Sequence, residues 1–273
     1  MSNQPFISLG QTPRNWRGIC VASNGDVYAC TTVAATGQIY LQSRGIGDFV
    51  SLNQTNKNYN GLCAAPNGDI YACVNNGAGG IFIRAGGVGD FVSLAQTTRN
   101  WSGMAADSNG DIYACVAATN GGVYKRTGGA GDFQTFTQTL RNLSGICIAP
   151  NGDAYTCVNG NGIFVRTGRT GDFVTLSETS RAYQGLCAAP NGDIYACDYN
   201  GNLYKRTGGS GRFISLVQTV RAWYGMGAGS NGDVFAAVAS GTVGGIFKQL
   251  KVSPTNRSKG LGAAAGFGFG FRM

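Results

Sequence analysis

The sequence contains no histidine, and acidic side chains are scarce, with 13 Asp and Glu among 273 residues. Charged residues make up 12% of the chain, about half the usual share of a globular domain. The missing imidazole removes the side chain that most readily exchanges protons near neutral pH. No stretch approaches the ~20 apolar residues that a membrane helix requires, so membrane insertion is not expected.

The N-terminal residues have neither a basic start nor an apolar run, so no signal peptide is predicted and synthesis in the cytoplasm is expected. The formal charge is +8, and half of this excess comes from four basic residues at the C-terminal end. A modest positive charge favours anionic surfaces without specifying a partner. The weakly basic body and the lack of a binding motif argue against nucleic acid as a partner.

Glycine is abundant, with 45 residues, and 14 Phe and 12 Tyr accompany it. Disordered chains are poor in aromatic residues, so the glycines are better explained by many turns. This composition predicts short strands connected by Gly-rich turns.

One unit is written six times along the chain. Each copy begins with a Phe-x-x-Leu or Phe-x-x-Phe strand, near residues 6, 49, 91, 133, 173 and 213. A period of ~40–45 residues suits four-stranded propeller blades. Each copy also contains an Asn-Gly-Asp turn, and Asn-Gly is the strongest short hairpin signal. We predict an all-β fold, a six-bladed β-propeller of four-stranded blades.

The two ends of the repeat region complement one another. The chain opens with a fourth-strand motif at residues 6–9 and ends its repeats with a third strand at residues 245–248. The N-terminal strand is therefore predicted to complete the last blade, which closes the ring without a free edge. The first strand of each unit, rich in Gly, Ala and Cys, is expected nearest the axis. This gives a propeller over residues 1–251 and a tail over residues 252–273.

The Pro-Asn-Gly-Asp-Ile-Tyr-Ala hairpins, written in full at residues 66–72 and 190–196, resemble those of NHL-type and tachylectin-like propellers. The resemblance extends over nearly all of the ring and implies the propeller fold. It does not select a function, because propellers include lectins, scaffolds, lactonases and lyases.

Ten of the 13 acidic residues belong to the repeat, six in the Asn-Gly-Asp turn and four before the Phe of a fourth strand. The other three, Asp107, Glu178 and Asp198, fall in different units and are not expected to converge. A propeller enzyme requires a converging cluster of carboxylates, imidazoles or metal ligands. We therefore expect a non-enzymatic protein without a cofactor or a metal site.

Nine cysteines occur, and four pairs of them lie ten residues apart across the first hairpin of a unit. The equivalent positions elsewhere hold Ala or Gly, which indicates selection for small size and favours buried, reduced thiols. A disulfide across each hairpin is the alternative, although the odd number and the absent signal peptide speak against it.

The link into each first strand carries a cation, followed two residues later by a large apolar side chain that is aromatic in five of the six units. The candidate ligand-binding residues are Arg14, Trp16, Tyr59, Arg99, Trp101, Arg141, Arg181, Tyr183, Arg221 and Trp223. In a structural interpretation, each cation stacks on an aromatic ring or ties neighbouring blades together. In a functional one, aromatic platforms beside the cations form a multivalent face that contacts glycans.

The tail alternates Gly with Phe and is basic. Its candidate anchor residues, toward other proteins of a larger assembly, are Phe267, Phe269, Phe271 and Arg272. The alternatives are a strand folded back on the ring or a disordered end. This arrangement resembles the propeller modules of bacteriophage tails and other virion appendages, which implies a virion-associated module contacting glycans or partner proteins. A free-standing tachylectin-like lectin and a propeller hydrolase or lyase remain as alternatives.

Overall fold

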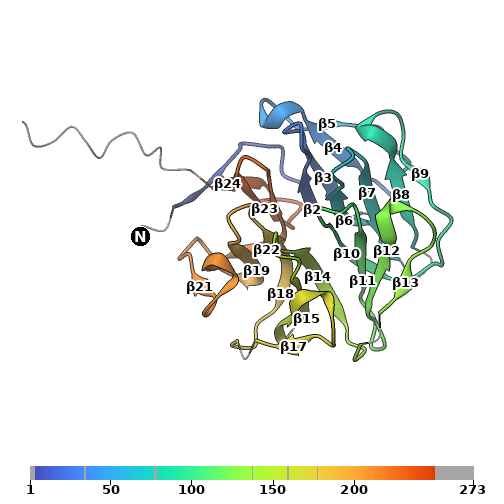
Figure 1. The fold of residues 1–273 in the computed structure, drawn as a ribbon. Coiled ribbons are helices and arrows are strands. Elements are labelled where there is room, and N and C mark those ends of the chain that lie inside the picture. The colour runs from blue at the N-terminus through green and yellow to red at the C-terminus, as the bar shows by residue number, and fades with distance from the viewer. Residues whose placement is uncertain are drawn as a thin grey trace, which may run out of the picture.

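The computed structural model describes residues 4–33, 35–76, 79–136, 138–158, 160–176 and 178–249. These residues form short antiparallel strands arranged around a central axis, as in a β-propeller (Figure 1). The predicted anchor, Phe267, Phe269, Phe271 and Arg272, lies outside the described residues, as does the predicted boundary between ring and tail. Within the described part, no helix has the length and apolar character needed to span a membrane.

Four of the repeats form separate four-stranded sheets, whose strands follow one another in chain order. Their strands are β2 (Trp16–Val21), β3 (Val27–Thr31), β4 (Ile39–Gln42) and β5 (Val50–Ser51); β6 (Tyr59–Ala64), β7 (Ile70–Val74), β8 (Ile81–Arg84) and β9 (Val92–Ser93); β10 (Trp101–Ala106), β11 (Ile112–Val116), β12 (Val123–Arg126) and β13 (Gln134–Thr135); β14 (Leu143–Ile148), β15 (Ala154–Val158), β16 (Gly162–Arg166) and β17 (Val174–Thr175). The turns after the third strands form short 3-10 segments, η1 (Ser43–Gly45), η2 (Ala85–Gly87), η3 (Thr127–Gly129), η4 (Thr167–Arg169) and η5 (Thr207–Gly209).

The last two repeats share one eight-stranded sheet. Its strands are β18 (Tyr183–Ala188), β19 (Ile194–Gly201), β20 (Leu203–Arg206) and β21 (Ile214–Ser215), then β22 (Arg221–Ala228), β23 (Val234–Val238), β24 (Ile246–Gln249) and β1 (Phe6–Ser8). β19 and β22 are longer than their counterparts and pair with each other, with Tyr199 opposite Ala222.

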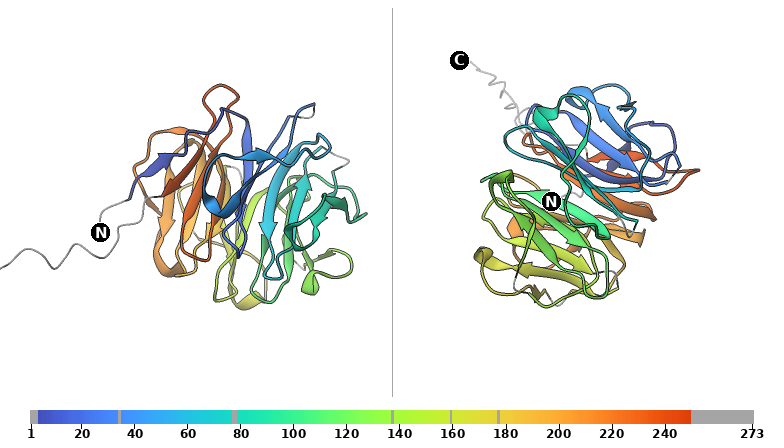
Figure 2. Two further views of the ribbon diagram at one scale, coloured as in Figure 1. Left: turned by 90° about the horizontal axis from the view of Figure 1, so that it is seen from above. Right: turned by 90° about the vertical axis from the view of Figure 1, so that its right-hand side faces the viewer.

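The N-terminal strand completes the last repeat, as predicted. β1 pairs antiparallel with β24, with Phe6 opposite Gln249. The backbone N–H of Phe6 also donates to Gln218 Oε1 at 2.9 Å. Figure 2 shows the blue N-terminal strand beside the red-orange strands of the last repeat. The ring is therefore closed by residues from opposite ends of the chain.

The first strands of the repeats surround the axis. Each of β2, β6, β10, β14, β18 and β22 contacts the first strands of both neighbouring repeats, and β22 contacts β2. Each of these strands contains a glycine at the equivalent position, which is the third residue of the first five strands and the fifth residue of β22. A Cβ added to Gly61 would stand 3.0 Å from Gly103 Cα, closer than ordinary contacts allow. Glycine thus lets the first strands approach one another at the centre.

The turn aspartates hold the hairpins together. In the second repeat, Asp69 Oδ1 accepts a hydrogen bond of 2.7 Å from Gly86 N, and Asn67 donates to Asp69 Oδ2. This bond ties the first hairpin to the turn after the third strand. In the fifth repeat, a lysine adds an ion pair, with Lys205 Nζ 2.6 Å from Asp193 Oδ2. These aspartates therefore have the structural role that their position in a turn predicts.

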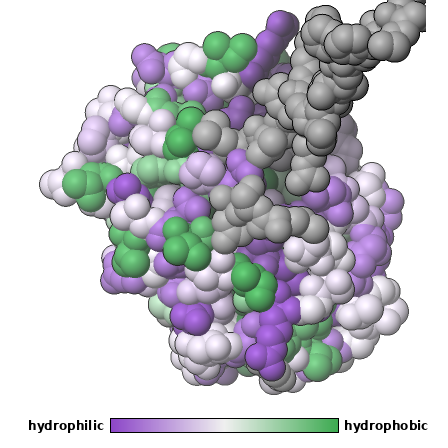
Figure 3. Space-filling view, turned by 90° about the vertical axis from the view of Figure 1, so that its left-hand side faces the viewer, coloured by the Kyte–Doolittle hydropathy of each residue, from purple (hydrophilic) through white to green (hydrophobic). Residues whose placement is uncertain are grey.

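The hydrophobic core lies between neighbouring sheets. One cluster, for example, joins Tyr71, Cys73 and Ile81 of the second repeat to Trp101 and Ile112 of the third. On the outside, apolar side chains form small separate patches among polar ones (Figure 3). Outermost strands of only two or three residues leave little backbone edge for another chain to pair with.

All nine cysteines are buried and free. The strand register explains why they are not bridged, because Cys63 stands opposite Tyr71, whereas Cys73 stands opposite Gly61. The two thiols of a pair thus occupy different rungs of the ladder. Burial raises the pKa of Cys115 to about 11, although a hydrogen bond with Ser102 acts in the opposite direction. The interpretation as small, reduced core side chains is therefore confirmed.

Candidate functional site

The five aromatic residues predicted as ligand platforms are buried. Trp16, Trp101 and Trp223 are each 1% exposed, as are Tyr59 and Tyr183. The Trp16 ring, for example, lies 5.0 Å from that of Tyr40, measured between centroids. These side chains fill the gap between adjacent sheets, where large apolar groups are stabilised by burial. They offer no open face to a sugar, which corrects the expectation of exposed platforms.

The cations of the same links stack on aromatic rings of the third strands, as the structural interpretation expects. Measured from the charged group to the ring centroid, the pairs are Arg14 and Tyr40 at 4.8 Å, Lys57 and Phe82 at 5.2 Å, Arg99 and Tyr124 at 4.5 Å, Arg141 and Phe164 at 4.5 Å, Arg181 and Tyr204 at 4.9 Å, and Arg221 and Phe247 at 4.8 Å. Ligand binding by these cations stays a prediction.

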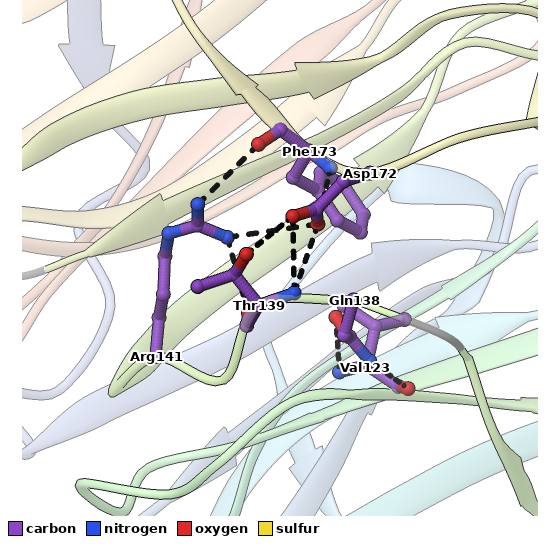
Figure 4. Close-up of polar contacts among 6 residues, drawn as sticks. All are labelled: Val123, Gln138, Thr139, Arg141, Asp172 and Phe173. Carbon is purple, nitrogen blue, oxygen red and sulfur yellow. Dashed lines mark hydrogen bonds and ion pairs between the residues drawn. The ribbon is translucent and has the colours of Figure 1, made fainter.

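Arg141 shows how such a cation also ties the chain together (Figure 4). Its Nη1 donates to Thr139 O at 3.1 Å, and its Nη2 donates to Phe173 O at 3.5 Å. Nη1 also lies 3.9 Å from Asp172 Oδ1, and that carboxylate accepts the backbone N–H of Thr139. Arg141 therefore fastens the link before β14 to the residues that precede β17.

A second set of residues, which sequence reasoning missed, lines a recess on the axis. Each of these residues directly precedes the glycine of a first strand, and we call them the axial ring: Arg17, Asn60, Ser102, Ser144, Gln184 and Tyr224. The recess has a volume of about 40 Å³. The signal was present in the sequence, since this position holds five residue types while the next position is glycine in every repeat.

A β-bulge brings the axial ring to its place. In each pairing of a first with a second strand, the register shifts around the axial-ring residue, as between Trp101 and Gly103 in the third repeat. A bulge adds an unpaired residue to one strand and re-aims its side chain. The first residue, such as Trp101, can therefore pack between sheets while the second, Ser102, lines the axis.

Three members of the axial ring join neighbouring first strands. Asn60 Nδ2 donates to Ser102 O at 2.7 Å, and Ser102 Oγ donates to Leu143 O at 2.7 Å. Ser144 Oγ donates likewise to Tyr183 O at 2.8 Å. These bonds hold the ring together around half of its circumference.

Arg17 and Tyr224 meet where the last repeat joins the first. The guanidinium carbon of Arg17 lies 3.6 Å from the centroid of the Tyr224 ring. Tyr199 adds a second ring, edge-on to Tyr224 at a centroid distance of 6.4 Å. This sector departs from the six-fold repeat, because β19 extends to Gly201 only here.

The Arg17–Tyr224 pair places a cation against a buried phenol. Arg17 Nε is buried and has no hydrogen-bond partner within the part of the chain that the structure describes. Burial raises the pKa of Tyr224, and the charge and hydrogen bond of Arg17 oppose that rise. At neutral pH, the pair therefore combines a fixed positive charge with a protonated phenol.

The three acids outside the repeat pattern do not converge. Asp107 lies in the hairpin of the third repeat, and its Oδ2 is 3.0 Å from Nη2 of Arg169, which belongs to η4. Glu178 Oε1 accepts the backbone N–H of Phe213 at 3.3 Å, as glutamine does in other repeats. Asp198 lies in β19 beside Tyr199, and burial raises the pKa of its carboxyl, opposed by Arg181 and by the backbone N–H of Ala182.

No protein-family model matches the sequence, and no curated protein is detectably similar to it. Many solved structures, however, share its fold. A gluconolactonase from Xanthomonas campestris has a TM-score of 0.69 at 11% identity, over 90% of this chain and 89% of that one. The calcium-binding protein regucalcin from Agrobacterium tumefaciens has a TM-score of 0.68 at 13% identity, over 91% and 95%. A streptogramin B lyase has a TM-score of 0.62 at 16% identity, over 91% and 87%.

These similarities establish a fold of the β-propeller type. Two of the three neighbours carry enzyme names, which contradicts the expectation of a non-enzymatic module. None of the three is named as a virion protein or a tachylectin, so the resemblances to virion modules and to NHL-type or tachylectin-like propellers find no support. The expectation of a non-enzymatic module had required a converging cluster of acids or imidazoles in an enzyme and took no account of the residues that line the axis.

One neighbour is named as a calcium-binding protein, so the fit of the axial ring to a metal ion can be tested. Calcium takes six to eight oxygen ligands, with carboxylates prominent among them. The axial ring contains a guanidinium, amides and hydroxyls but no carboxylate. Across the described ranges, no group of three or more His, Cys, Asp or Glu side chains could hold a metal. The axial ring therefore does not fit a divalent cation.

Proposed function

We propose that the chain is a propeller hydrolase or lyase that opens an ester bond, and that its active site is the axial ring. The observation that carries this proposal is the Arg17 guanidinium, fixed 3.6 Å over Tyr224 with a buried, unpartnered Nε at a recess on the axis. The gluconolactonase and lyase names of proteins with the same fold support it.

The chemistry of ester opening explains the choice of Arg17. When water attacks an ester, negative charge builds on the carbonyl oxygen before the C–O bond breaks. When the ester is eliminated instead, negative charge builds on the carboxylate that leaves. A guanidinium held in place beforehand stabilises either charge more in the transition state than in the ground state. Both reactions also yield a carboxylate, and both therefore suit a cationic recess.

We assign the proton transfers to Tyr224, which lines the recess, and to Asp198 of β19, which precedes the Tyr199 whose ring packs edge-on to that of Tyr224. Tyr224, kept protonated by burial, supplies a proton to an oxygen on which charge develops. Asp198 accepts a proton from the attacking water in hydrolysis, or, in elimination, from the carbon next to the one that bears the leaving carboxylate, so that a C=C bond forms as the C–O bond breaks. Its raised pKa brings a carboxylate closer to neutrality, which suits a general base. Turnover should therefore rise with pH as Asp198 loses its proton.

We further propose that the ring has six blades. The eight-stranded sheet consists of two four-stranded repeats joined only by the pairing of β19 with β22. The closed cycle of contacts among the six first strands supports the count.

The test is turnover by the full-length protein on a panel of lactones, aryl esters and cyclic depsipeptides. Proton release at constant pH measures ester opening by either route, and mass spectrometry distinguishes the products of elimination from those of hydrolysis. Turnover should fall about 100-fold or more in Arg17→Gln, the order expected for loss of an oxyanion donor. The matched control is Arg212→Gln, which removes an equal charge from an exposed loop. Wild-type rates equal to those of buffer across the panel would overturn the proposal.

A separate variant tests the proposed base. Asp198→Asn should lower turnover and abolish its rise with pH, while Asp107→Asn should leave the pH profile unchanged because Asp107 binds Arg169 elsewhere. An unchanged profile in Asp198→Asn would remove Asp198 from the mechanism without removing Arg17.

A further inference from the structure

We infer that the axial ring is a binding site for a carboxylate group, rather than for a metal cation, and that the acid formed by the proposed reaction is held there. This inference rests on the proposed function only for its biological use. The binding itself follows from charge, unsatisfied donors and size.

The charge of the recess is positive. Arg17 is the one ionised member of the axial ring, and the other five members are amides, hydroxyls and a phenol. Burial keeps the pKa of Tyr224 high, so the phenol adds no negative charge near neutral pH. A small cavity with low-dielectric walls strengthens the field of its single charge. An anion is therefore attracted to the recess, and a cation is repelled.

The donors of the recess suit a planar oxyanion. A guanidinium carries five N–H donors, whose fork matches the two oxygens of a carboxylate. Arg17 Nε is buried without a hydrogen-bond partner in the described ranges, although an unpaired buried donor is costly. The buried amides of Asn60 and Gln184 line the same recess. A bound carboxylate would satisfy Nε and remove this cost.

The size of the recess limits what enters it. About 10–15 Å³ of such volume holds one water, so a volume of about 40 Å³ admits roughly three water-sized groups. A carboxylate has three heavy atoms. The remainder of a larger acid would have to lie outside the recess. We expect the site to recognise the carboxylate and to tolerate different substituents on it.

Sodium acetate is the probe for this inference, titrated into full-length protein by calorimetry at constant ionic strength. We expect saturable binding that weakens at least about tenfold in Arg17→Gln, equivalent to 1.4 kcal/mol, and stays unchanged in Arg212→Gln. Calcium chloride should give no saturable heat. Equal acetate affinity in wild type and a folded Arg17→Gln would overturn the inference, as would saturable calcium binding that acetate does not share.

A second measurement observes the Arg17 side chain directly. In protein labelled with ¹⁵N-arginine, acetate should shift one Nε resonance saturably, with the same midpoint as the calorimetric titration. Arg17→Lys, which keeps the charge but loses the fork, should bind acetate more weakly and identify that resonance by its absence. A saturable heat without any shift of an Nε resonance would place acetate elsewhere and overturn the inference.

The two proposals fail separately. Acetate binding without turnover on the panel supports the carboxylate site and contradicts the proposed enzyme. Turnover that acetate does not inhibit, in a protein that does not bind acetate, supports the enzyme and overturns the carboxylate site.

Discussion

Arg17 belongs to the first of the six first strands and Tyr224 to the last, yet the guanidinium carbon of Arg17 lies 3.6 Å from the Tyr224 ring centroid. The contact exists because β22 packs against β2 when the ring closes. Closure of the fold and assembly of the proposed site are thus one event. A chain that failed to close would lack the pair.

The first prediction concerns the ionisation of Tyr224. Burial raises the pKa of Tyr224, and Arg17 opposes this rise by its charge and hydrogen bond. Removing the cation in Arg17→Gln should therefore move the pKa of Tyr224 still higher. The measurement is a pH titration of ¹³C-labelled tyrosine by NMR, with the signal assigned by its loss in Tyr224→Phe. A pKa that stays the same or falls would show that Arg17 does not act on the phenol.

The second prediction concerns stability in acid. Burial alone would raise the pKa of Asp193, but hydrogen bonds from Lys205, Gly208 and Asn191 outweigh it and hold the pKa below the usual value of 3.8. The unfolded chain therefore binds this proton more tightly. The stability that Asp193 contributes is present above the unfolded pKa and is lost as pH falls through the folded pKa.

Asp193→Asn should cost about 1–3 kcal/mol of unfolding free energy at pH 7, as for a hydrogen bond to a charged group. The matched control is Asp153→Asn, because Asp153 makes the same turn but Val165 occupies the place of Lys205. Urea unfolding should give a smaller cost for the control, with the gap between the variants narrowing below about pH 4. A gap equally large at pH 3 would contradict the role of the ion pair.

Much of the fold could be predicted because the turn motifs and the length of the repeat both indicate four-stranded blades. The Asn-Gly-Asp turns fixed the first hairpins, and the early Phe6 motif revealed that β1 completes the last repeat. The pairing of Tyr199 with Ala222 could not be predicted, since it depends on how two neighbouring repeats meet. No local pattern distinguishes β19 from its counterparts until that contact is made.

The site was harder to predict for a related physical reason. A cation followed two residues later by a large apolar side chain, as in Arg14 and Trp16, recurs in every repeat because this pair packs the sheets together. The residue that varies, Arg17 in β2 and Tyr224 in β22, is free to vary because a bulge turns it away from that packing. The variation is visible in the sequence, but only the register of the strands shows that the variable side chain lines the axis.

The third prediction concerns the nine thiols. Burial raises the pKa of Cys30 and of Cys157 to about 12, and that of Cys115 to about 11, so few thiolates exist at pH 8. Because the thiolate is the reactive form, the native protein should react with a disulfide reagent only as it unfolds. The measurement is the rate at which the protein thiols react with the disulfide reagent, with and without guanidinium chloride. Fast reaction of any thiols in the native protein would show that part of the ring opens readily.

The fourth prediction tests why the first strands carry glycine. A Cβ added to Gly225 would overlap the backbone carbonyl oxygen of Arg17, which has no flexible end that could move aside. Gly225→Ala should therefore destabilise the protein by about 1–3 kcal/mol or more, the usual cost of overpacking. For a chain of this size, the melting temperature should fall by roughly 2–4 °C for each kcal/mol.

Gly241→Ala is the control, because no heavy atom lies within 4 Å of its added Cβ. Its unfolding free energy should stay within about 0.5 kcal/mol of the wild type. The two variants separate close approach from the general effect of replacing glycine, since both gain one methyl group. If Gly225→Ala is as stable as Gly241→Ala, then β22 and β2 are not in contact and the ring does not close there. If it is destabilised but folded, the shift forced on the Arg17 backbone should also weaken acetate binding, because Arg17 is held where the two ends of the ring meet.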